Sequence, residues 1–178
     1  TNTDLAAVPE RFTNNPAAEV EIFRRALTAA KKDMRNLGDG LVNKLSSEEL
    51  ALFDVYIRML DDSSLGGEVI ASITAGQTAQ SAWSSVILKH VRTFRQMDDL
   101  YLRERAADVN DLGKRVLGYL QTSHKKELPM PRRVVLVGED LSATALADIP
   151  VNRLVGIISL KGSSNSHMAI VGRALGIP

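Results

Sequence analysis

The 178-residue sequence contains no cysteine, which excludes disulfides and thiolate metal sites and is typical of a reducing compartment. Aromatic residues make up only 4%, too few for a platform that stacks nucleic-acid bases. The 22 Lys and Arg nearly balance the 21 Asp and Glu, which argues against nucleic-acid binding through total charge. No apolar run is long enough to span a membrane, and residues 1–4 do not begin a signal peptide. We therefore expect a cytoplasmic globular protein.

Both ends of the sequence are unusual for a complete protein. Residues 1–4 lack a methionine, and residues 176–178 stop on turn residues. We expect the chain to be a piece of a longer protein, with room for one domain or two small ones.

Proline is missing between Pro16 and Pro129, which permits long helices in that stretch. Asn15 can cap the first of them, with Pro16 at its first position. Apolar residues then recur at alternating steps of three and four, the seam of an antiparallel hairpin or a short coiled coil. This seam consists of Val20, Phe23, Leu27, Ala30, Met34, Leu37 and Leu41.

The rest of that stretch carries further helix signals. Ser46 and Glu49 have the spacing of a capping box. Residues 61–64 break the helix that follows, and a short helix then ends at Gly76. A last helical tract covers residues 78–122, with a break expected at residues 98–99. The predicted apolar stripe of the capping-box helix consists of Leu50, Phe53, Ile57 and Leu60. The sequence thus predicts four main helices and one short one.

The pattern changes after a basic, proline-containing linker at residues 123–132. Short β-branched runs at residues 134–137 and 154–158 predict two buried strands, with a short helix at 142–147 between them. A polar loop at 162–166 precedes a helix that begins at His167. This alternation predicts part of a parallel α/β domain. Because two strands do not form a stable sheet alone, we expect the rest outside this chain, or in part before Pro9.

Of the three histidines, only His167 has a setting that suggests catalysis. His90 lies in a predicted helix and His124 in the linker, and neither has a second metal ligand at suitable spacing. His167 opens a helix after a polar loop, where backbone N–H groups and the helix dipole can hold a phosphoryl group. The dipole also disfavours a protonated imidazole, and a neutral ring beside an anion site is a suitable nucleophile. The alternative interpretation, an inert capping loop that happens to contain a histidine, stays open.

Two motifs resemble signatures of a known family. Residues 162–178, Gly-Ser-Ser-Asn-Ser-His-Met-Ala-Ile-Val-Gly-Arg-Ala-Leu-Gly-Ile-Pro, resemble the phosphohistidine signature of phosphoenolpyruvate-utilising enzymes. Residues 101–115, Tyr-Leu-Arg-Glu-Arg-Ala-Ala-Asp-Val-Asn-Asp-Leu-Gly-Lys-Arg, resemble a signature of enzyme I of the phosphoenolpyruvate-dependent phosphotransferase system. The two motifs occur in the order of the family, and a helical part precedes the histidine loop. Most of the chain therefore resembles the N-terminal region of enzyme I.

Departures from the family pattern favour the nitrogen-branch form of enzyme I. Asn165 replaces the threonine before Ser-His, Ser163 replaces the second glycine, and Gly172 replaces an alanine. The Asn-Ser-His sequence, together with residues 140–144 and 173–178, looks like the nitrogen branch.

The resemblance implies a phosphoryl-transfer mechanism. His167 would accept the phosphoryl group of phosphoenolpyruvate as nucleophile and pass it to a histidine of an HPr-like carrier, with the nitrogen-branch carrier NPr favoured. Ser142 and Thr144 are the candidates for the hydroxyl that orients this histidine in the family. The residues expected to hold the phosphoryl group are Gly162, Ser163, Asn165, Ser166 and Arg173.

The resemblance also implies what this chain lacks. Phosphoenolpyruvate and Mg²⁺ would bind in a C-terminal barrel outside these residues, so no cofactor or metal is expected in the chain itself. The chain alone should therefore not phosphorylate itself from phosphoenolpyruvate. It should be monomeric, whereas the full-length enzyme would be a homodimer through the barrel.

The helical part would dock the carrier protein. The positions that match the family's docking face are Tyr56, Met59, Asp61, Asp62, Leu65, Leu102 and Arg105. An apolar centre with a charged rim suits a transient interface, although Met59 and Leu65 also fit a bundle core. Ser63 and Ser64 replace acidic residues of the sugar-branch enzyme, which favours a different carrier from sugar-branch HPr.

We therefore predict an α+β chain in which a helical carrier-binding bundle, residues 16–122, joins a partial phosphohistidine α/β domain, residues 133–178. Residues 1–15 would be the end of an earlier part of the α/β domain or a linker. Two other functions stay open. One is the swivelling domain of a pyruvate phosphate dikinase-type enzyme, which lacks the motif of residues 101–115. The other is a non-enzymatic helical interaction module.

Overall fold

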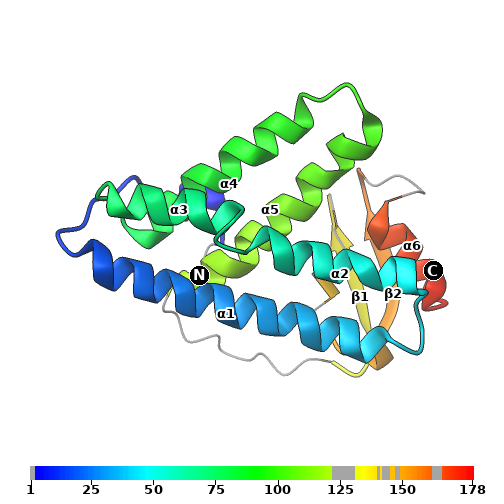
Figure 1. The fold of residues 1–178 in the computed structure, drawn as a ribbon. Helices are drawn as coiled ribbons and strands as arrows, with labels where there is room; N and C mark the ends of the chain where they lie inside the picture. The colour runs from blue at the N-terminus through cyan, green and yellow to red at the C-terminus, as the bar shows by residue number, and fades with distance from the viewer. Residues whose placement is uncertain (1–2, 122–130, 140, 142–144, 147–148, 162–165) are drawn as a thin grey trace.

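The chain folds into a helical part and a smaller α/β part (Figure 1). This computed structural model describes residues 3–121, 131–139, 141, 145–146, 149–161 and 166–178. The helical part comprises the 3₁₀ helix η1 (Leu5–Ala7) and helices α1 (Pro16–Leu41), α2 (Ser47–Met59), α3 (Leu65–Thr74), α4 (Ala79–Arg95) and α5 (Leu100–Leu120). The α/β part comprises strands β1 (Val134–Gly138) and β2 (Leu154–Ser159), the 3₁₀ helix η3 (Val151–Arg153) and helix α6 (His167–Ala174). This arrangement confirms the predicted fold class.

Local signals place the helix ends. The Asn15 side chain accepts a hydrogen bond from the backbone of the first turn of α1 at 3.2 Å. Ser46 and Glu49 make both bonds of the predicted capping box, at 3.3 and 2.8 Å. Gly76 follows α3 with a φ of 113°, a conformation that side chains disfavour. The break between α4 and α5 falls at residues 96–99, as predicted.

The helical part closes around one apolar core. Trp83 of α4 is fully buried in it, with its ring centroid 5.6 Å from that of Phe23 in α1. The indole N–H donates a hydrogen bond to the Gly113 carbonyl of α5 at 2.8 Å, so one side chain ties three helices together. Leu5 of η1 is buried in the same core. The buried members of the predicted α1 seam are Phe23, Leu27, Ala30, Met34 and Leu41.

A second core joins the helical part to the α/β part. It is built by side chains from the ends of α1 and α2 and by side chains from β2 and α6, and its members include Met34, Leu41, Phe53, Leu154, Met168 and Val171. The predicted stripe of α2 was wrong in part. Leu52 and Tyr56 are buried there, whereas Leu50 and Ile57 are only half-buried, because α2 packs toward both α1 and the α/β part.

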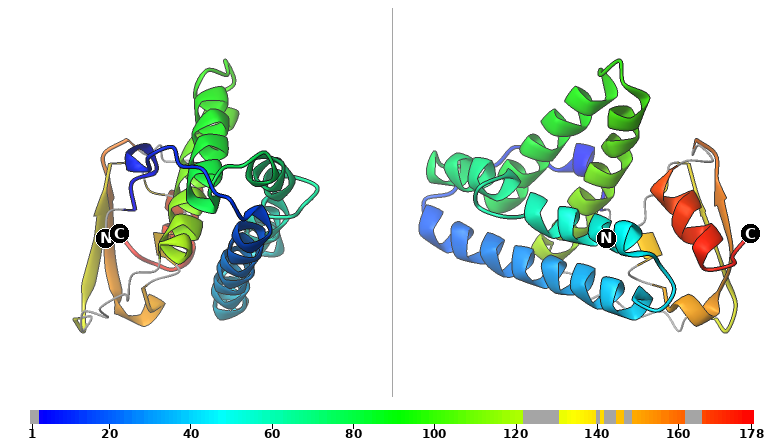
Figure 2. Two further views of the ribbon diagram at one scale, coloured as in Figure 1. Left: turned by 90° about the vertical axis from the view of Figure 1, so that its left-hand side faces the viewer. Right: turned by 45° about the vertical axis from the view of Figure 1, so that its right-hand side comes forward.

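Strands β1 and β2 are parallel neighbours, as predicted, with Val135 opposite Gly156. The prediction that both strands are buried was wrong, since Val135, Val137 and Ile158 are 49%, 63% and 51% exposed. Successive side chains of a strand point to opposite faces. Helix α6 covers one face of the pair, and no described element covers the other (Figure 2).

Several sequence predictions lie outside the described residues, wholly or in large part. These are the linker at 123–132, His124, the helix at 142–147 and the loop at 162–165. Within the described part of the chain, no helix combines the length and apolar character needed to cross a membrane.

Candidate active site

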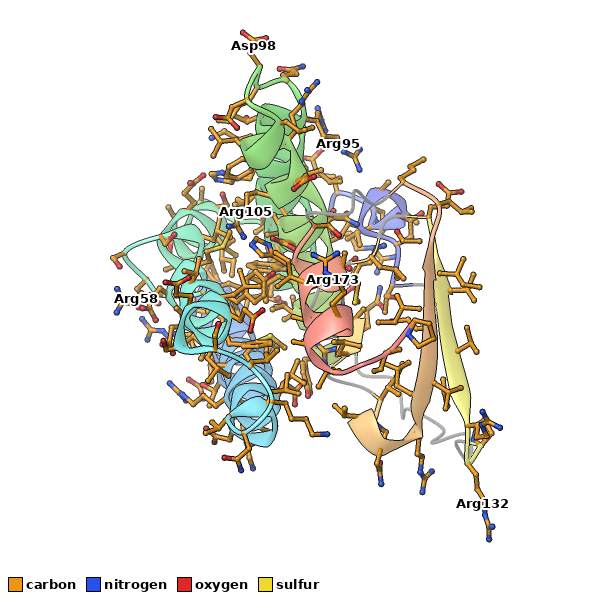
Figure 3. The ribbon with its side chains drawn as sticks, turned by 90° about the vertical axis from the view of Figure 1, so that its right-hand side faces the viewer. Arg58, Arg95, Asp98, Arg105, Arg132 and Arg173 are labelled. Atoms are coloured by element: carbon orange, nitrogen blue, oxygen red, sulfur yellow. The ribbon has the colours of Figure 1, made fainter. Side chains whose placement is uncertain are left out.

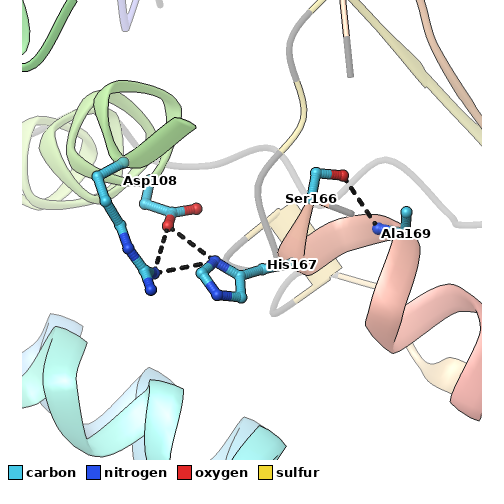
Figure 4. A network of polar contacts seen from close by, with 5 residues as sticks. Asp108, Ser166, His167 and Ala169 are labelled. Carbon is cyan, nitrogen blue, oxygen red and sulfur yellow. Dashed lines mark hydrogen bonds and ion pairs between the residues drawn. The ribbon is translucent and has the colours of Figure 1, made fainter. Parts of the chain in front are cut away.

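His167 is the first residue of α6, and its side chain points toward α5 (Figure 4). The preceding residue, Ser166, caps the helix by accepting a hydrogen bond from the Ala169 N–H at 3.3 Å. The imidazole is 23% exposed. It lies at the boundary between the two parts of the molecule, because α6 belongs to the α/β part and α5 to the helical part. This places the ring at the positive end of a helix dipole, where a phosphoryl group is also stabilised.

Two residues of α5 contact one ring nitrogen of His167. Asp108 Oδ2 lies 3.2 Å from His167 Nδ1, and Arg105 Nη1 lies 2.9 Å from the same atom. Arg105 and Asp108 also pair with each other at 3.1 Å, so the three side chains form a closed triangle (Figure 4). About 60 residues of sequence separate the histidine from this pair, and only the tertiary fold brings them together.

The negative charge of Asp108 is buried, with 5% of its side chain exposed, and Arg105 supplies the compensating cation. Tyr56 of α2 is buried beside this pair. Burial raises the pKa of Tyr56 well above its ordinary value, and the charge of Asp108 raises it further. The hydroxyl faces the Asp108 carboxylate, and a hydrogen bond between them, although not of ideal geometry, raises the pKa of Tyr56 as well. It therefore stays a protonated donor at neutral pH.

A cavity of about 500 Å³ adjoins this triangle between α2, α3, α4 and α5. Tyr56, Arg105 and Asp108 contribute polar groups to its wall, and a Glu68–His90 pair with a 2.8 Å contact lies on another side. The apolar part of the wall consists of Val55, Met59, Leu65, Phe94 and Val109. The mixture of apolar surface and a few convergent polar groups is typical of a binding site.

The structure gathers four of the predicted docking residues around this cavity, namely Tyr56, Met59, Leu65 and Arg105. Arg105 lies on the face that α5 turns toward α6 (Figure 3). Tyr56 and Leu65 are buried and Met59 is half-buried. These residues thus contribute to the core as well as to the cavity, and their docking role stays a prediction.

The remaining predicted docking residues are not among those that line the cavity. Asp61 pairs with Lys31 of α1 at 2.6 Å, and Asp62 lies 3.6 Å from Arg24. Leu102 is half-buried on α5. The acidic turn after α2 is therefore partly neutralised by cations from α1.

The residues predicted to hold the phosphoryl group are only partly described. Ser166 caps α6, whereas Arg173 is exposed in its last turn, at the opposite end from His167. Gly162, Ser163 and Asn165, and the hydroxyl candidates Ser142 and Thr144, lie outside the described residues. Their roles stay predictions.

Sequence reasoning did not single out Asp108. It lies in the motif of residues 101–115, three positions after Arg105, and this spacing puts both side chains on one face of a helix. That spacing could have marked Arg105 and Asp108 as a pair, but it could not have identified His167 as the residue that they contact. Across the described residues, no three His, Asp or Glu side chains gather closely enough to hold a metal ion.

Two family descriptions match the chain in order. Residues 4–105 match the N-terminal domain of PEP-utilising enzymes, and residues 130–178 match their mobile domain. A protein of Escherichia coli (strain K12) described as "Phosphoenolpyruvate-dependent phosphotransferase system" is 39% identical over 174 residues, which are 98% of this chain and 23% of the relative. The phosphoenolpyruvate-protein phosphotransferase of Staphylococcus aureus (strain MRSA252) is 33% identical over 180 residues, which cover 98% of this chain and 31% of the relative.

Solved structures show the same fold. The N-terminal domain of "Enzyme 1 - Nitrogen" is 37% identical and superposes with a TM-score of 0.71, covering 98% of this chain and 71% of that one. The solution structure of an enzyme I protein, 24% identical, has a TM-score of 0.70 and covers 97% and 71%. This chain belongs to the phosphoenolpyruvate-utilising enzymes, as an N-terminal region of the enzyme I type found in phosphotransferase systems.

Proposed function

We propose that the whole protein is a phosphoenolpyruvate-protein phosphotransferase in which His167 carries the phosphoryl group to a carrier protein. One observation carries this proposal. A histidine at the N-terminus of a helix in the mobile domain is held at a single ring nitrogen by an Arg–Asp pair of the helical domain. The helix N-terminus supports an anion there, and the pair orients the ring.

The contacts favour Nε2 as the reacting atom, because Arg105 and Asp108 both approach Nδ1. The Nε2 lone pair would form a bond to phosphorus while the bond from phosphorus to its donor breaks. The bonding electrons would leave with the enol oxygen of phosphoenolpyruvate, or with the ring nitrogen of a phosphorylated carrier. Positive charge would grow on the ring of His167, and an Nδ1–H directed at Asp108 would stabilise it, as a carboxylate does for a catalytic histidine.

The carrier would dock over the cavity between α2, α3, α4 and α5, and we favour a carrier of the nitrogen-branch NPr type. The 37% identity to a nitrogen-branch structure supports this choice. The rim supports it too, since Ser63 and Ser64 add no charge there and the Asp61 and Asp62 carboxylates lie near Lys31 and Arg24. Phosphoenolpyruvate and Mg²⁺ would bind in a part of the whole protein beyond these residues. The whole protein would act in the cytoplasm.

The test uses the 178-residue chain and a purified, radiolabelled phospho-form of an HPr-like carrier. We expect label to appear on the chain, to disappear in His167→Ala, and to persist in His124→Gln as a matched histidine control. We expect no label from phosphoenolpyruvate and Mg²⁺ without a carrier. Equal labelling of His167→Ala would contradict the proposed phosphohistidine. A wild-type chain that accepts no label from either an NPr-type or an HPr-type carrier would also contradict the proposal.

A further inference from the structure

Two chemically opposite groups approach the same atom of His167. Arg105 Nη1 lies 2.9 Å from Nδ1 and can only donate a hydrogen bond. The ionised carboxylate of Asp108, whose Oδ2 lies 3.2 Å from Nδ1, can only accept one. A neutral imidazole carries its single ring proton on either Nδ1 or Nε2. Both contacts therefore cannot be hydrogen bonds at the same time.

Each bond selects one tautomer of the neutral ring. When Arg105 donates to Nδ1, the ring proton is on Nε2, and Nε2 has no lone pair in the ring plane with which to attack phosphorus. When Nδ1–H donates to Asp108, the lone pair is on Nε2. Because the reaction proposed above needs that lone pair, the Arg105-bound ring is the resting form and the Asp108-bound ring is the reactive form.

We propose that Arg105 and Asp108 form a tautomer switch, which an oxyanion in the adjoining cavity turns to the reactive state by drawing Arg105 away from Nδ1. The inference rests on the proposed function for its meaning, and on the contacts at Nδ1 for its existence. Arg105 lines the cavity, and so does Tyr56, whose buried hydroxyl lies beside Asp108.

The charges around the cavity allow this exchange. A guanidinium binds a phosphoryl dianion more strongly than it binds a neutral imidazole, because both partners are then charged. The carboxylate of Glu68 on another side of the wall is already engaged by His90 at 2.8 Å and lies 3.5 Å from Lys89. The exchange takes Arg105 away from Nδ1, and the Nδ1–H that replaces this contact gives Asp108 one more hydrogen-bond donor.

Nitrogen-15 NMR of the wild-type chain measures the ratio of the two tautomers directly, at a pH above the titration range of histidine. We expect inorganic phosphate to shift His167 toward the Nδ1–H tautomer, and potassium chloride at equal ionic strength to leave it unchanged. Arg105→Met should produce that shift without phosphate, by about tenfold in the tautomer ratio, and Asp108→Asn should shift the ratio in the opposite direction. Arg103→Met, an exposed arginine on the same helix, is the control and should match the wild type.

Opposite shifts in the two variants support the switch, because a merely structural role would not reverse sign. Shifts of the same sign, or none, in variants whose amide spectra show a folded chain would overturn it. If a variant does not fold, the phosphate titration of the wild type decides, and an unchanged ratio at saturating phosphate overturns the switch. The NMR experiment involves no phosphoryl donor. A chain that accepts label from a carrier but shows no shift contradicts only the switch, and a chain that shifts but accepts no label contradicts only the proposed function.

Discussion

The helical part and the α/β part reach their stability in different ways. The helices enclose their own core around Trp83 and add polar links between α1 and α5, namely the ion pair of Arg115 with Asp33 at 2.9 Å and the Tyr119 hydroxyl bond to the same carboxylate at 2.7 Å. The two strands expose one apolar face and bury the other against α6, α1 and α2. His167, the proposed nucleophile, belongs to the less enclosed part, whereas Arg105 and Asp108, which contact its ring, belong to the helical part.

This difference explains how the site is assembled. Asp108 and Arg105 are fixed on α5, a 21-residue helix that packs on both α1 and α4. His167 reaches them from α6, an 8-residue helix. This helix packs on a sheet in which two strands are described. A histidine on a small domain can leave a pair held on a long helix and return to it, which suits the proposed transfer between a phosphoryl donor and an acceptor.

The largest effect should come from the helical core. Trp83→Ala removes a fully buried ring and its hydrogen bond to Gly113, and should lower the free energy of unfolding by about 3–5 kcal/mol. Urea unfolding followed by circular dichroism measures this loss. Phe12→Ala, at a side chain 72% exposed, is the aromatic control and should stay within about 0.5 kcal/mol. Comparable losses in both variants would show that the core is not centred on Trp83.

The next effect tests whether the two parts unfold together. Met168→Ala empties a buried site in the shared core, and should cost about 2 kcal/mol because that site can partly collapse. We expect faster amide hydrogen exchange in β2 and α6, while the fluorescence transition of Trp83, the single tryptophan, keeps its midpoint. A Trp83 transition lowered as much as the exchange protection of β2 would show that the two parts form one cooperative unit.

A smaller effect should follow from a close approach of helices. A Cβ at Gly113 in α5 would lie 2.6 Å from Ile87 Cγ2 and 2.9 Å from Leu5 Cδ1, so Gly113→Ala should cost about 1–3 kcal/mol through overpacking. Gly40→Ala in α1 is the matched control, because no atom lies within 4 Å of its added Cβ. It should stabilise the chain by about 0.5 kcal/mol through helix propensity. Thermal unfolding of the two variants measures both changes in stability. An increase in stability for Gly113→Ala would contradict the packing described for α4, α5 and η1.

The smallest effects concern pH. Burial raises the pKa of Glu68, but the hydrogen bond and charge of His90, with Lys89, outweigh it and hold the pKa below 4.5. A carboxyl with a lowered folded pKa stabilises the fold above its ordinary pKa, and this stability is lost as the pH falls below 4.5 through the folded value. His90→Gln should therefore flatten the decline of stability below pH 4.5.

The α/β part offers a matched comparison for this effect. The hydrogen bond and charge of Lys161 likewise lower the pKa of Glu139, but the side chains of that pair are 67% and 71% exposed, against 27% and 42% for His90 and Glu68. Lys161→Met should change the acid limb less than His90→Gln does, because water screens an exposed pair. Unfolding midpoints measured over a series of pH values test both substitutions. A larger change in Lys161→Met would contradict the contrast between the two parts.

Sequence patterns were most informative where structure depends on near neighbours. The caps at Asn15 and Ser46, the buried seam of α1 and the break between α4 and α5 follow from contacts three or four residues apart. The same reasoning found the two strands but was wrong about their burial. A β-branched run predicts a strand, but burial of its two faces depends on which other elements pack against it.

Residue patterns were enough to predict the order of the elements, the family and the candidate nucleophile, because motif spacing and helix signals are local properties. The atoms that surround His167 depend instead on how the helices pack. This packing placed Arg105 and Asp108 at Nδ1, buried Tyr56 beside them and hollowed the adjoining cavity. The physical reason is the separation of 59 and 62 residues between these partners, since a contact of that kind depends on how whole helices pack and leaves no periodic trace in the sequence.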